Sequence, residues 1–448
     1  MHIDFLVEGF RRNGHQDAIV WKDRTFSYGW MLDAFDQWAR CLEEEAIKPG
    51  SIVSLEADFS PDSIAIMLAL IERGCVIVPL AESAGSRKPE FREIAEVEVV
   101  ITVGRDDRAE VCPTGMIARH ELLARLRKDL RPGLTLFSSG STGKSKASVH
   151  DFIFLLEKFK VPRHSKRILT FLLFDHIGGI NTLFYSLSNS GCVVAVDDRS
   201  PDSVCEAIEK HRVQLLPTSP TFINLLLLSE AYTRHDLSSL ETVTYGTEVM
   251  PESTLLRFHQ LFPHVRLLQT YGLSEVGILR SQSKSSDSLW VKIGGEGFET
   301  RVVDGMLQVK ARSAMLGYLN APSPFTEDGW FQTGDAVEVD GEYYRILGRK
   351  SEMINVGGEK VYPAEVESIL QSMEGVADVT VSAEGHRITG QIVRAKVRLA
   401  TGETLAEFRK RMRLFCGDKL PAFKIPQKVI LVSEAMHGER YKKIRIGS

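Results

Sequence analysis

A short segment rich in hydroxyl groups, glycines and lysines is the first candidate for chemistry in this sequence. Residues 138–147 have the sequence SSGSTGKSKA. Glycines permit tight turns whose backbone N–H groups converge on an anion, and Ser139, Ser141, Thr142 and Lys146 add donors and positive charge. The segment therefore suits a phosphate group. Taken alone, it is equally compatible with a flexible connection between a strand over LTLFS and a helix over DFIFLLEKF.

The Walker A loop of P-loop NTPases is one specific form of phosphate site. Gly143, Lys144 and Ser145 match the end of that motif, which also requires a glycine five positions before its second glycine. Ser138 stands at that position. The spacing therefore excludes a Walker-type kinase or ATPase.

Composition limits the classes of protein to consider. The chain has 448 residues, of which 43% are hydrophobic and 25% charged, with a formal net charge of −4. This length predicts more than one folding unit, and the charge gives no general attraction to nucleic acid or anionic membranes. The sequence has no run of about 18 apolar residues, and its amino-terminal apolar stretch is too short and acidic for a signal peptide. We expect no membrane span and a cytoplasmic location.

The six cysteines give no sign of a zinc site or a disulfide framework. They are far apart in sequence and include no C-x-x-C pair. Such spacing is typical of buried thiols.

Two segments of the first three quarters show βαβ patterns. In residues 60–80 a serine cap and a proline precede an apolar helix, which ends at Gly74 before a continuous apolar strand. Residues 191–217 repeat this order as strand, Ser-Pro helix start and strand. Because these strands are apolar on both faces, they suit parallel sheets covered by helices on each side.

The last part of the chain has a different pattern. Residues 281–288 are polar and mostly serine, which predicts a surface loop. Two Asp-Gly pairs between alternating strands then predict β-hairpins that end near Arg349. Beyond that residue, helix and strand patterns predict a small α+β domain, so we expect domains over 1–348 and 349–448.

Four further motifs follow the first segment in order: QTYGLSEVG at 269–277, WFQTGD at 330–335, GRKSEMINVGGEKVYPAEVE at 348–367 and KKIR at 442–445. The whole set resembles the adenylate-forming superfamily of acyl-CoA synthetases, peptide-synthetase adenylation domains and luciferases. This resemblance covers nearly the whole chain. It implies an α/β fold with a large amino-terminal domain of two α/β subdomains and a β subdomain, followed by a small mobile α+β domain.

The resemblance also implies a two-step reaction. A carboxylate is a poor electrophile, so the acid first attacks the α-phosphate of ATP to give acyl-AMP and pyrophosphate, and a pantetheine thiol of CoA or a carrier protein then takes the acyl group. Because two anions meet in the first step, the site must neutralise charge that develops on phosphorus. The expected cofactors are ATP and Mg²⁺.

By resemblance, the first segment holds the β- and γ-phosphates through Ser139, Gly140, Ser141, Thr142, Gly143 and Lys146. Ser145 and Ala147 replace the proline and glycine that usually flank this lysine. Glu275, together with Thr142, corresponds to the magnesium-binding position, and Ser274 lies beside the α-phosphate.

The remaining nucleotide contacts are also assigned by resemblance. Tyr271 would stack on adenine, next to Gly272, and the segment of Gly246, Thr247 and Glu248 would pass along the base. Asp335 would accept both ribose hydroxyls, with Arg349 as a second ribose or phosphate contact. Lys350 stands where the family has its hinge residue.

Two residues are expected to act on the acid itself. Lys443 is our choice for the lysine that lies between carboxylate and α-phosphate, as in the family's Gly-Lys-Ile-x-Arg run. A shift of one position would exchange it for Lys442. His176 matches the position that lies over the substrate carboxylate.

Substrate and acceptor are only partly defined by the sequence. Amino-acid-activating relatives have an aspartate at the head of the acyl pocket, and the nearest candidate here, Asp175, precedes His176 in a different register. We therefore expect a fatty or aryl acid. A carrier-dependent amino-acid adenylation enzyme is one alternative. A non-catalytic nucleotide-binding relative is another, suggested by Ser145, Ala147 and Lys442.

Overall fold

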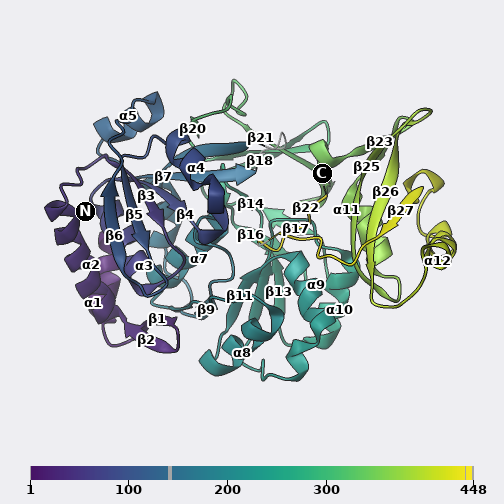
Figure 1. Ribbon diagram of the computed structural model, residues 1–448, viewed down its shortest axis with the longest axis horizontal. Helices are drawn as coiled ribbons and strands as arrows, with labels where there is room; N and C mark the ends of the chain where they lie inside the picture. The colour runs from purple at the N-terminus through teal and green to yellow at the C-terminus, as the bar shows by residue number, and fades with distance from the viewer. Residues whose placement is uncertain (1, 140–143, 439, 446–448) are drawn as a thin grey trace.

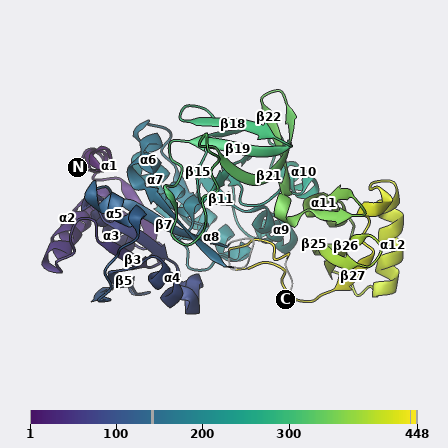
Figure 2. The ribbon, with the colours of Figure 1, turned by 90° about the horizontal axis from the view of Figure 1, so that it is seen from above.

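The computed structural model describes residues 2–139, 144–438 and 440–445, which form four parts (Figure 1). They are two α/β subdomains, a β subdomain and a small carboxy-terminal domain, and the first α/β subdomain and the carboxy-terminal domain lie at opposite ends of the molecule. Figure 2 shows the β subdomain above the junction between the α/β pair and the carboxy-terminal domain. No helix among these residues is long and apolar enough to cross a bilayer.

The first α/β subdomain contains a sheet of order β20-β8-β7-β4-β3-β5-β6. Its strands β3, β4, β5 and β7 are parallel, β6 and β8 run antiparallel to them, and β20 pairs antiparallel with β8. The bounds are β3 (Ile52–Glu56), β4 (Val76–Leu80), β5 (Val99–Val103), β6 (Ala109–Pro113), β7 (Gly133–Ser139), β8 (Ser145–Asp151) and β20 (Gly317–Tyr318).

The second α/β subdomain contains a sheet of order β13-β12-β11-β9-β10-β1-β2, parallel except for β2. The parallel arrangement that the apolar strands predicted is confirmed in both sheets. The bounds are β1 (Asp17–Trp21), β2 (Arg24–Ser27), β9 (Arg167–Leu169), β10 (Cys192–Val194), β11 (Leu215–Thr218), β12 (Thr242–Tyr245) and β13 (Arg266–Gln269).

Helices cover both faces of these sheets. A shared core joins the two subdomains through α1 (Asp4–Arg12), α2 (Tyr28–Glu44), α3 (Pro61–Glu72), α6 (Phe152–Leu156) and α7 (Ile177–Ser188). The outer layers contain α4 (Lys88–Ile94) and α5 (Glu121–Lys128) on the first sheet, and α8 (Pro201–His211), α9 (Pro220–Ser229) and α10 (Glu252–Leu261) on the second. Helix α3 begins at the predicted Ser60 cap and is buried along almost its whole length, as its apolar sequence requires.

The β subdomain contains β16 (Ser281–Ser283), β17 (Val291–Ile293), β18 (Phe298–Val303), β19 (Met306–Ala311), β21 (Phe331–Asp340) and β22 (Tyr343–Arg349), with the short pair β14 (Gly272–Leu273) and β15 (Gly277–Ile278) nearby. Both predicted Asp-Gly hairpins form, β18–β19 and β21–β22. At the first, Asp304 and Gly305 have φ of 52° and 74°, the left-handed geometry that favours Asp-Gly in such turns.

The serine-rich segment is not simply the surface loop that its composition predicted. Part of it forms β16, and three hydroxyls cover the free edge of β13: Ser286, Ser283 and Ser281 accept hydrogen bonds from the backbone N–H groups of residues 267, 269 and 271. Those three N–H groups alternate along the chain, as outward-facing groups of an edge strand do. The hydroxyls thus replace a neighbouring strand.

The carboxy-terminal domain has a sheet of order β24-β23-β26-β25, with β27 on β26. Its elements are β23 (Ile354–Val356), β24 (Glu359–Val361), α11 (Pro363–Gln371), β25 (Val376–His386), β26 (Gly390–Leu399), α12 (Leu405–Gly417) and β27 (Lys428–Leu431). The chain leaves the β subdomain at Arg349 and enters this sheet at Ile354. The predicted division at 348/349 lies at the start of this passage and stays a prediction.

The chain after β27 returns to the second α/β subdomain. We call residues 432–438 and 440–445 the strap; Figure 1 shows it in yellow, running back toward the centre of the molecule. Ser219 Oγ donates to Tyr441 O at 2.7 Å, and Lys443 N donates to Glu248 Oε2 at 3.2 Å. These contacts fix the strap on the large domain.

Candidate active site

The second sheet brings several predicted residues to one edge. Parallel strands β11, β12 and β13 end at Thr218, Tyr245 and Gln269, and these three positions lie in register. The segments that follow, 246–248 and 270–275, therefore start side by side at the carboxyl edge, where open α/β sheets bind ligands.

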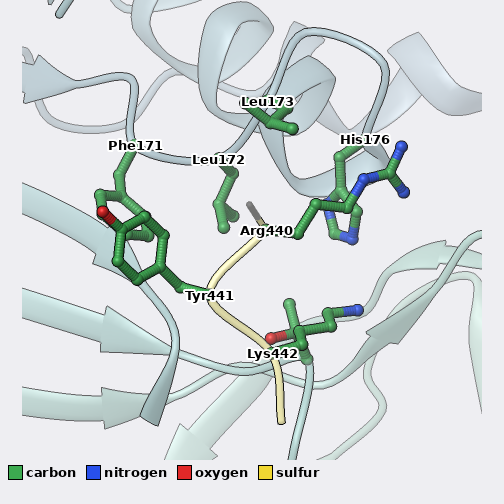
Figure 3. A pocket seen from close by; sticks show the side chains of 8 residues that line it. Phe171, Leu172, Leu173, His176, Arg440, Tyr441 and Lys442 are labelled. Carbon is green, nitrogen blue, oxygen red and sulfur yellow. The ribbon is translucent and has the colours of Figure 1, made fainter. Parts of the chain in front are cut away.

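A pocket lies between this part of the large domain and the strap (Figure 3). Its walls are Phe171, Leu172, Leu173, His176 and Thr247 from the large domain and Arg440, Tyr441 and Lys442 from the strap. The side chains of Arg440 and Lys442 both extend toward the side of the pocket where His176 lies. The pocket thus combines apolar walls with two cations and an imidazole.

Lys442, and not Lys443, enters this pocket. Burial lowers the pKa of Lys442 to about 8; Glu248 opposes that shift, while Arg440 and Arg349 add to it. Lys443 points the other way, where its Nζ donates to Val379 O at 2.8 Å and lies 3.7 Å from Glu367 Oε2. The structure therefore does not bring Lys443 to the pocket, contrary to our expectation.

The sequence contained a signal for this register. In the pattern Gly-Lys-Ile-x-Arg the arginine follows the lysine by three positions, and Arg445 follows Lys442 by three. Arg445 itself is buried against Glu367, to which its Nη2 donates at 2.8 Å. Lys442 stands three positions before this anchored arginine and therefore corresponds to the lysine of the pattern.

His176 is held as a neutral donor. It caps α7, where its Nδ1 accepts a hydrogen bond from Gly178 N at 3.0 Å. Burial, with Lys442 and Arg440 adding to it, holds the pKa of His176 well below its usual value. A neutral ring whose Nδ1 accepts must carry its proton on Nε2, so that nitrogen can donate to an oxygen in the pocket.

Glycines permit the close packing around the pocket. A Cβ on Gly179 would lie 2.0 Å from Leu173 O, so only glycine lets α7 start against the 172–173 wall. A Cβ on Gly246 would lie 2.7 Å from Thr270 Oγ1, and one on Gly272 would lie 2.4 Å from Ile278 Cδ1. Thr247, which follows Gly246, has a φ of 75°, a strained backbone conformation for a β-branched residue. Thr247 also forms part of the pocket wall.

Glu248 contacts the strap. One oxygen accepts from Thr221 N at 2.9 Å and from the Thr221 hydroxyl, and the other accepts from Lys443 N. We had expected this carboxylate beside adenine. Its described contacts join α9 to the strap, and a place beside adenine stays a prediction.

Asp335, Tyr271 and Arg349 form the second predicted group. Asp335 Oδ2 accepts from Tyr271 Oη at 2.6 Å, and Asp335 Oδ1 lies 3.0 Å from Arg349 Nε. Burial raises the pKa of Asp335, and Arg349 and the Tyr271 hydroxyl oppose this rise. The three residues predicted to contact the nucleoside thus share one hydrogen-bonded cluster, and Arg349 connects it electrostatically to Lys442.

Glu275 lies near both groups. Its Oε1 accepts from Tyr318 Oη at 2.7 Å, while Lys146 Nζ lies 5.3 Å from the centre of the Tyr318 ring. Ser274, beside it, contributes its carbonyl to His150 Nε2 at 2.6 Å. Tyr318 is a contact that our sequence analysis missed, because no motif identified it.

The contacts of Glu275 fit one part of a magnesium site. Glu275 Oε2 has no hydrogen-bond partner among the described residues, and no three carboxylate, histidine or cysteine side chains cluster there. Mg²⁺ commonly binds through one or two carboxylates plus substrate phosphates, so a single free carboxylate oxygen fits that mode. The other predicted ligand, Thr142, lies outside the described residues.

The phosphate segment joins two strands rather than a strand and a helix. Strands β7 and β8 pair antiparallel, with Ser138 opposite Lys146 and Ser139 opposite Ser145. The helix predicted over DFIFLLEKF is confirmed as α6, which begins at Phe152, but the sequence pattern did not predict β8, the strand that lies between the loop and this helix. Gly140, Ser141, Thr142 and Gly143 lie outside the described residues.

Comparison with known proteins decides the family. A model described as "AMP-binding enzyme" matches residues 7–307, and one described as "AMP-binding enzyme C-terminal domain" matches residues 365–441. The chain belongs to the AMP-binding enzyme family. The predicted adenylate-forming fold is confirmed. Membership of this family identifies the chain as an acid–thiol ligase that activates its acid with ATP.

Similar proteins include indoleacetate–CoA ligase of Aromatoleum aromaticum, which is 27% identical over 93% of this chain and 91% of that protein. Feruloyl-CoA synthase of Amycolatopsis is 26% identical over 93% of this chain and 92% of that protein. The structure of the anthranilate CoA ligase AuaEII in complex with anthranoyl-AMP has the same fold, with a TM-score of 0.82 and 20% identity over 99% of this chain and 95% of that one.

Proposed function

We propose that this protein activates an aryl or fatty acid without an amino group as acyl-AMP and transfers the acyl group to CoA. The observation that carries the proposal is the position of Lys442, which the strap places in the pocket wall with His176 and within electrostatic reach of Glu275 and Arg349. A lysine so placed can neutralise charge where a carboxylate attacks a phosphate.

Each step of adenylation has a residue suited to it. The acid carboxylate accepts from His176 Nε2 and lies against Lys442, whose ammonium stabilises the charge that builds on the α-phosphate as pyrophosphate leaves. Asp335 accepts the ribose hydroxyls. Glu275 would hold Mg²⁺, which would neutralise part of the phosphate charge. Lys146 and its loop would receive the departing pyrophosphate.

The pocket favours an acid without an ammonium group. Asp175, the carboxylate nearest to the acyl pocket, is 5% exposed and already paired with Arg440 at 2.9 Å. Arg440 therefore already balances the charge of Asp175 in this arrangement, which weakens the attraction of Asp175 for a substrate ammonium group. The apolar walls of Phe171, Leu172 and Leu173 suit a hydrocarbon or aromatic body, and the similar CoA ligases named above support CoA over a carrier protein.

Two measurements test the function. Purified protein is offered ATP, Mg²⁺ and a panel of aryl, fatty and amino acids, and acid-dependent pyrophosphate release is followed, with CoA thioester as the second product. Release with at least one non-amino acid, followed by thioester when CoA is added, is the expected result. Tight ATP binding with no release across the panel would favour a non-catalytic relative instead.

A further inference from the structure

An ion pair joins the strap to the large domain beside the pocket, and the adenylation step described above gives it no part. Arg440 Nη2 donates to Asp175 Oδ2 at 2.9 Å across 265 residues of sequence. Asp175 stands immediately before the His176 cap of α7, and Arg440 stands two positions before Lys442 in the strap. The pair therefore connects the helix that carries the imidazole to the segment that carries the lysine.

The burial of the two partners is unequal. The Asp175 side chain is 5% exposed, whereas that of Arg440 is 33% exposed. Asp175 Oδ1 is fully buried and has no hydrogen-bond partner among the described residues. A carboxylate with one unpaired buried oxygen depends strongly on its single cationic partner, because a buried charge without a partner is costly.

We propose that Asp175 and Arg440 act as positioning residues that seat Lys442 for adenylation and not for thioester formation. This inference rests on the proposed function. The strap holds Arg440 at the pocket in the arrangement seen here. If the carboxy-terminal domain rotates before thioester formation, as the family resemblance implies, the pair breaks when the strap leaves. Asp175 also offsets the charge of Arg440, which otherwise opposes the charge of neighbouring Lys442.

The test separates the two half-reactions. Asp175→Asn, Arg440→Gln, the double variant and Arg440→Lys are compared in acid-dependent pyrophosphate release and in thioester formation from supplied acyl-AMP and CoA. We expect the first two to lose roughly 10- to 100-fold in the kcat of adenylation, as expected from misplacing a catalytic group. In the same variants, thioester formation from supplied acyl-AMP should change less than about threefold. Arg440→Lys should keep more adenylation activity than Arg440→Gln. The double variant should lose no more adenylation activity than either single variant, because both substitutions break the same pair.

Hydrogen exchange of the peptide spanning 436–445 provides a readout independent of activity. It should be faster in Asp175→Asn than in the wild type. Arg212→Gln, which breaks an exposed pair with Asp236 far from the pocket, serves as the matched control and should change neither half-reaction.

Three results would overturn the inference: unchanged adenylation in Asp175→Asn, equal loss in both half-reactions, or additive losses in the double variant. Each presupposes a wild-type protein that releases pyrophosphate with some acid. If the wild type releases none, the proposed function fails instead, so the two failures are distinguishable.

Discussion

Two neighbouring lysines on the strap have opposite environments. Lys442 lines the pocket, whereas Lys443 is bonded to Val379 and lies near Glu367 in the carboxy-terminal domain. The motif predicts a catalytic lysine in this run, and which of the two lysines it indicates depends on Arg445, whose anchoring is a tertiary contact. Asp175 and Arg440 could not be paired from the sequence at all, since no local pattern connects residues so far apart.

Replacing each lysine tests this assignment. Lys442→Ala should lower acid-dependent pyrophosphate release by about 10²–10³-fold, the usual effect of removing one group that stabilises transition-state charge. It should still form thioester from supplied acyl-AMP. Lys443→Ala should lose less than about tenfold in pyrophosphate release, because it removes a structural contact. The reverse ranking would return the catalytic role to Lys443.

The pKa of Lys442 predicts a pH dependence. The ammonium is the active form, and its pKa of about 8 lies below the usual value for lysine, so the active fraction is nearly complete a pH unit or more below 8, is one half near pH 8 and falls further as pH rises. Because kcat/KM reports ionisations of free enzyme, kcat/KM for ATP should fall about tenfold per pH unit well above pH 8.

Lys442→Arg provides the control for this pH profile. Its guanidinium stays charged throughout the range, so the variant should be slower but should lack the descending limb. If both enzymes show the same limb, another group causes it.

At the scale of elements, sequence patterns succeeded where local rules determine the structure. The Ser60 cap, Pro61 and the apolar run fix α3, and the Asp-Gly pairs fix two hairpins. The patterns failed for β8 and β16. Each contains two serines and few apolar residues, so periodicity gives little signal for a strand, although the partners β7 and β17 are close in sequence.

The serine hydroxyls on β13 should contribute measurably to stability. Ser283 is 9% exposed, and its Oγ accepts from Gln269 N at 2.7 Å. Ser283→Ala leaves that N–H without its acceptor and should lower the free energy of unfolding by about 1–3 kcal/mol. Denaturant unfolding measures the loss. Exposed Ser285→Ala is the matched control and should change stability by less than about 0.5 kcal/mol; equal effects would contradict a role for the hydroxyl as an edge acceptor.

At the scale of the whole molecule, the sequence predicted the order of parts but not their docking. The strap and the contacts between α10 and α11 hold the carboxy-terminal domain against the large domain with Lys442 inserted. The family resemblance implies that this domain rotates about Lys350 before thioester formation, so that the hairpin with Gly357 and Gly358 faces the site. The docked arrangement is therefore expected to serve adenylation only.

A reversible cross-link between α10 and α11 should separate the two steps. Ser253 Oγ lies 3.5 Å from Ser368 O across this interface, so Ser253→Cys with Ser368→Cys places two thiols near each other. The pair is made in a Cys112→Ser background, because Cys112 is exposed. The oxidised enzyme should keep acid-dependent pyrophosphate release within about threefold of the reduced enzyme, since Lys442 stays in place. Its conversion of acid, ATP and CoA to thioester should fall at least tenfold and return on reduction, as expected when a required domain movement is blocked.

Each single-cysteine variant, oxidised in the same way, controls for damage by the oxidant. If the cross-linked enzyme makes thioester at the reduced rate, one arrangement serves both steps, and the pocket built around Lys442 must then also admit the thiol.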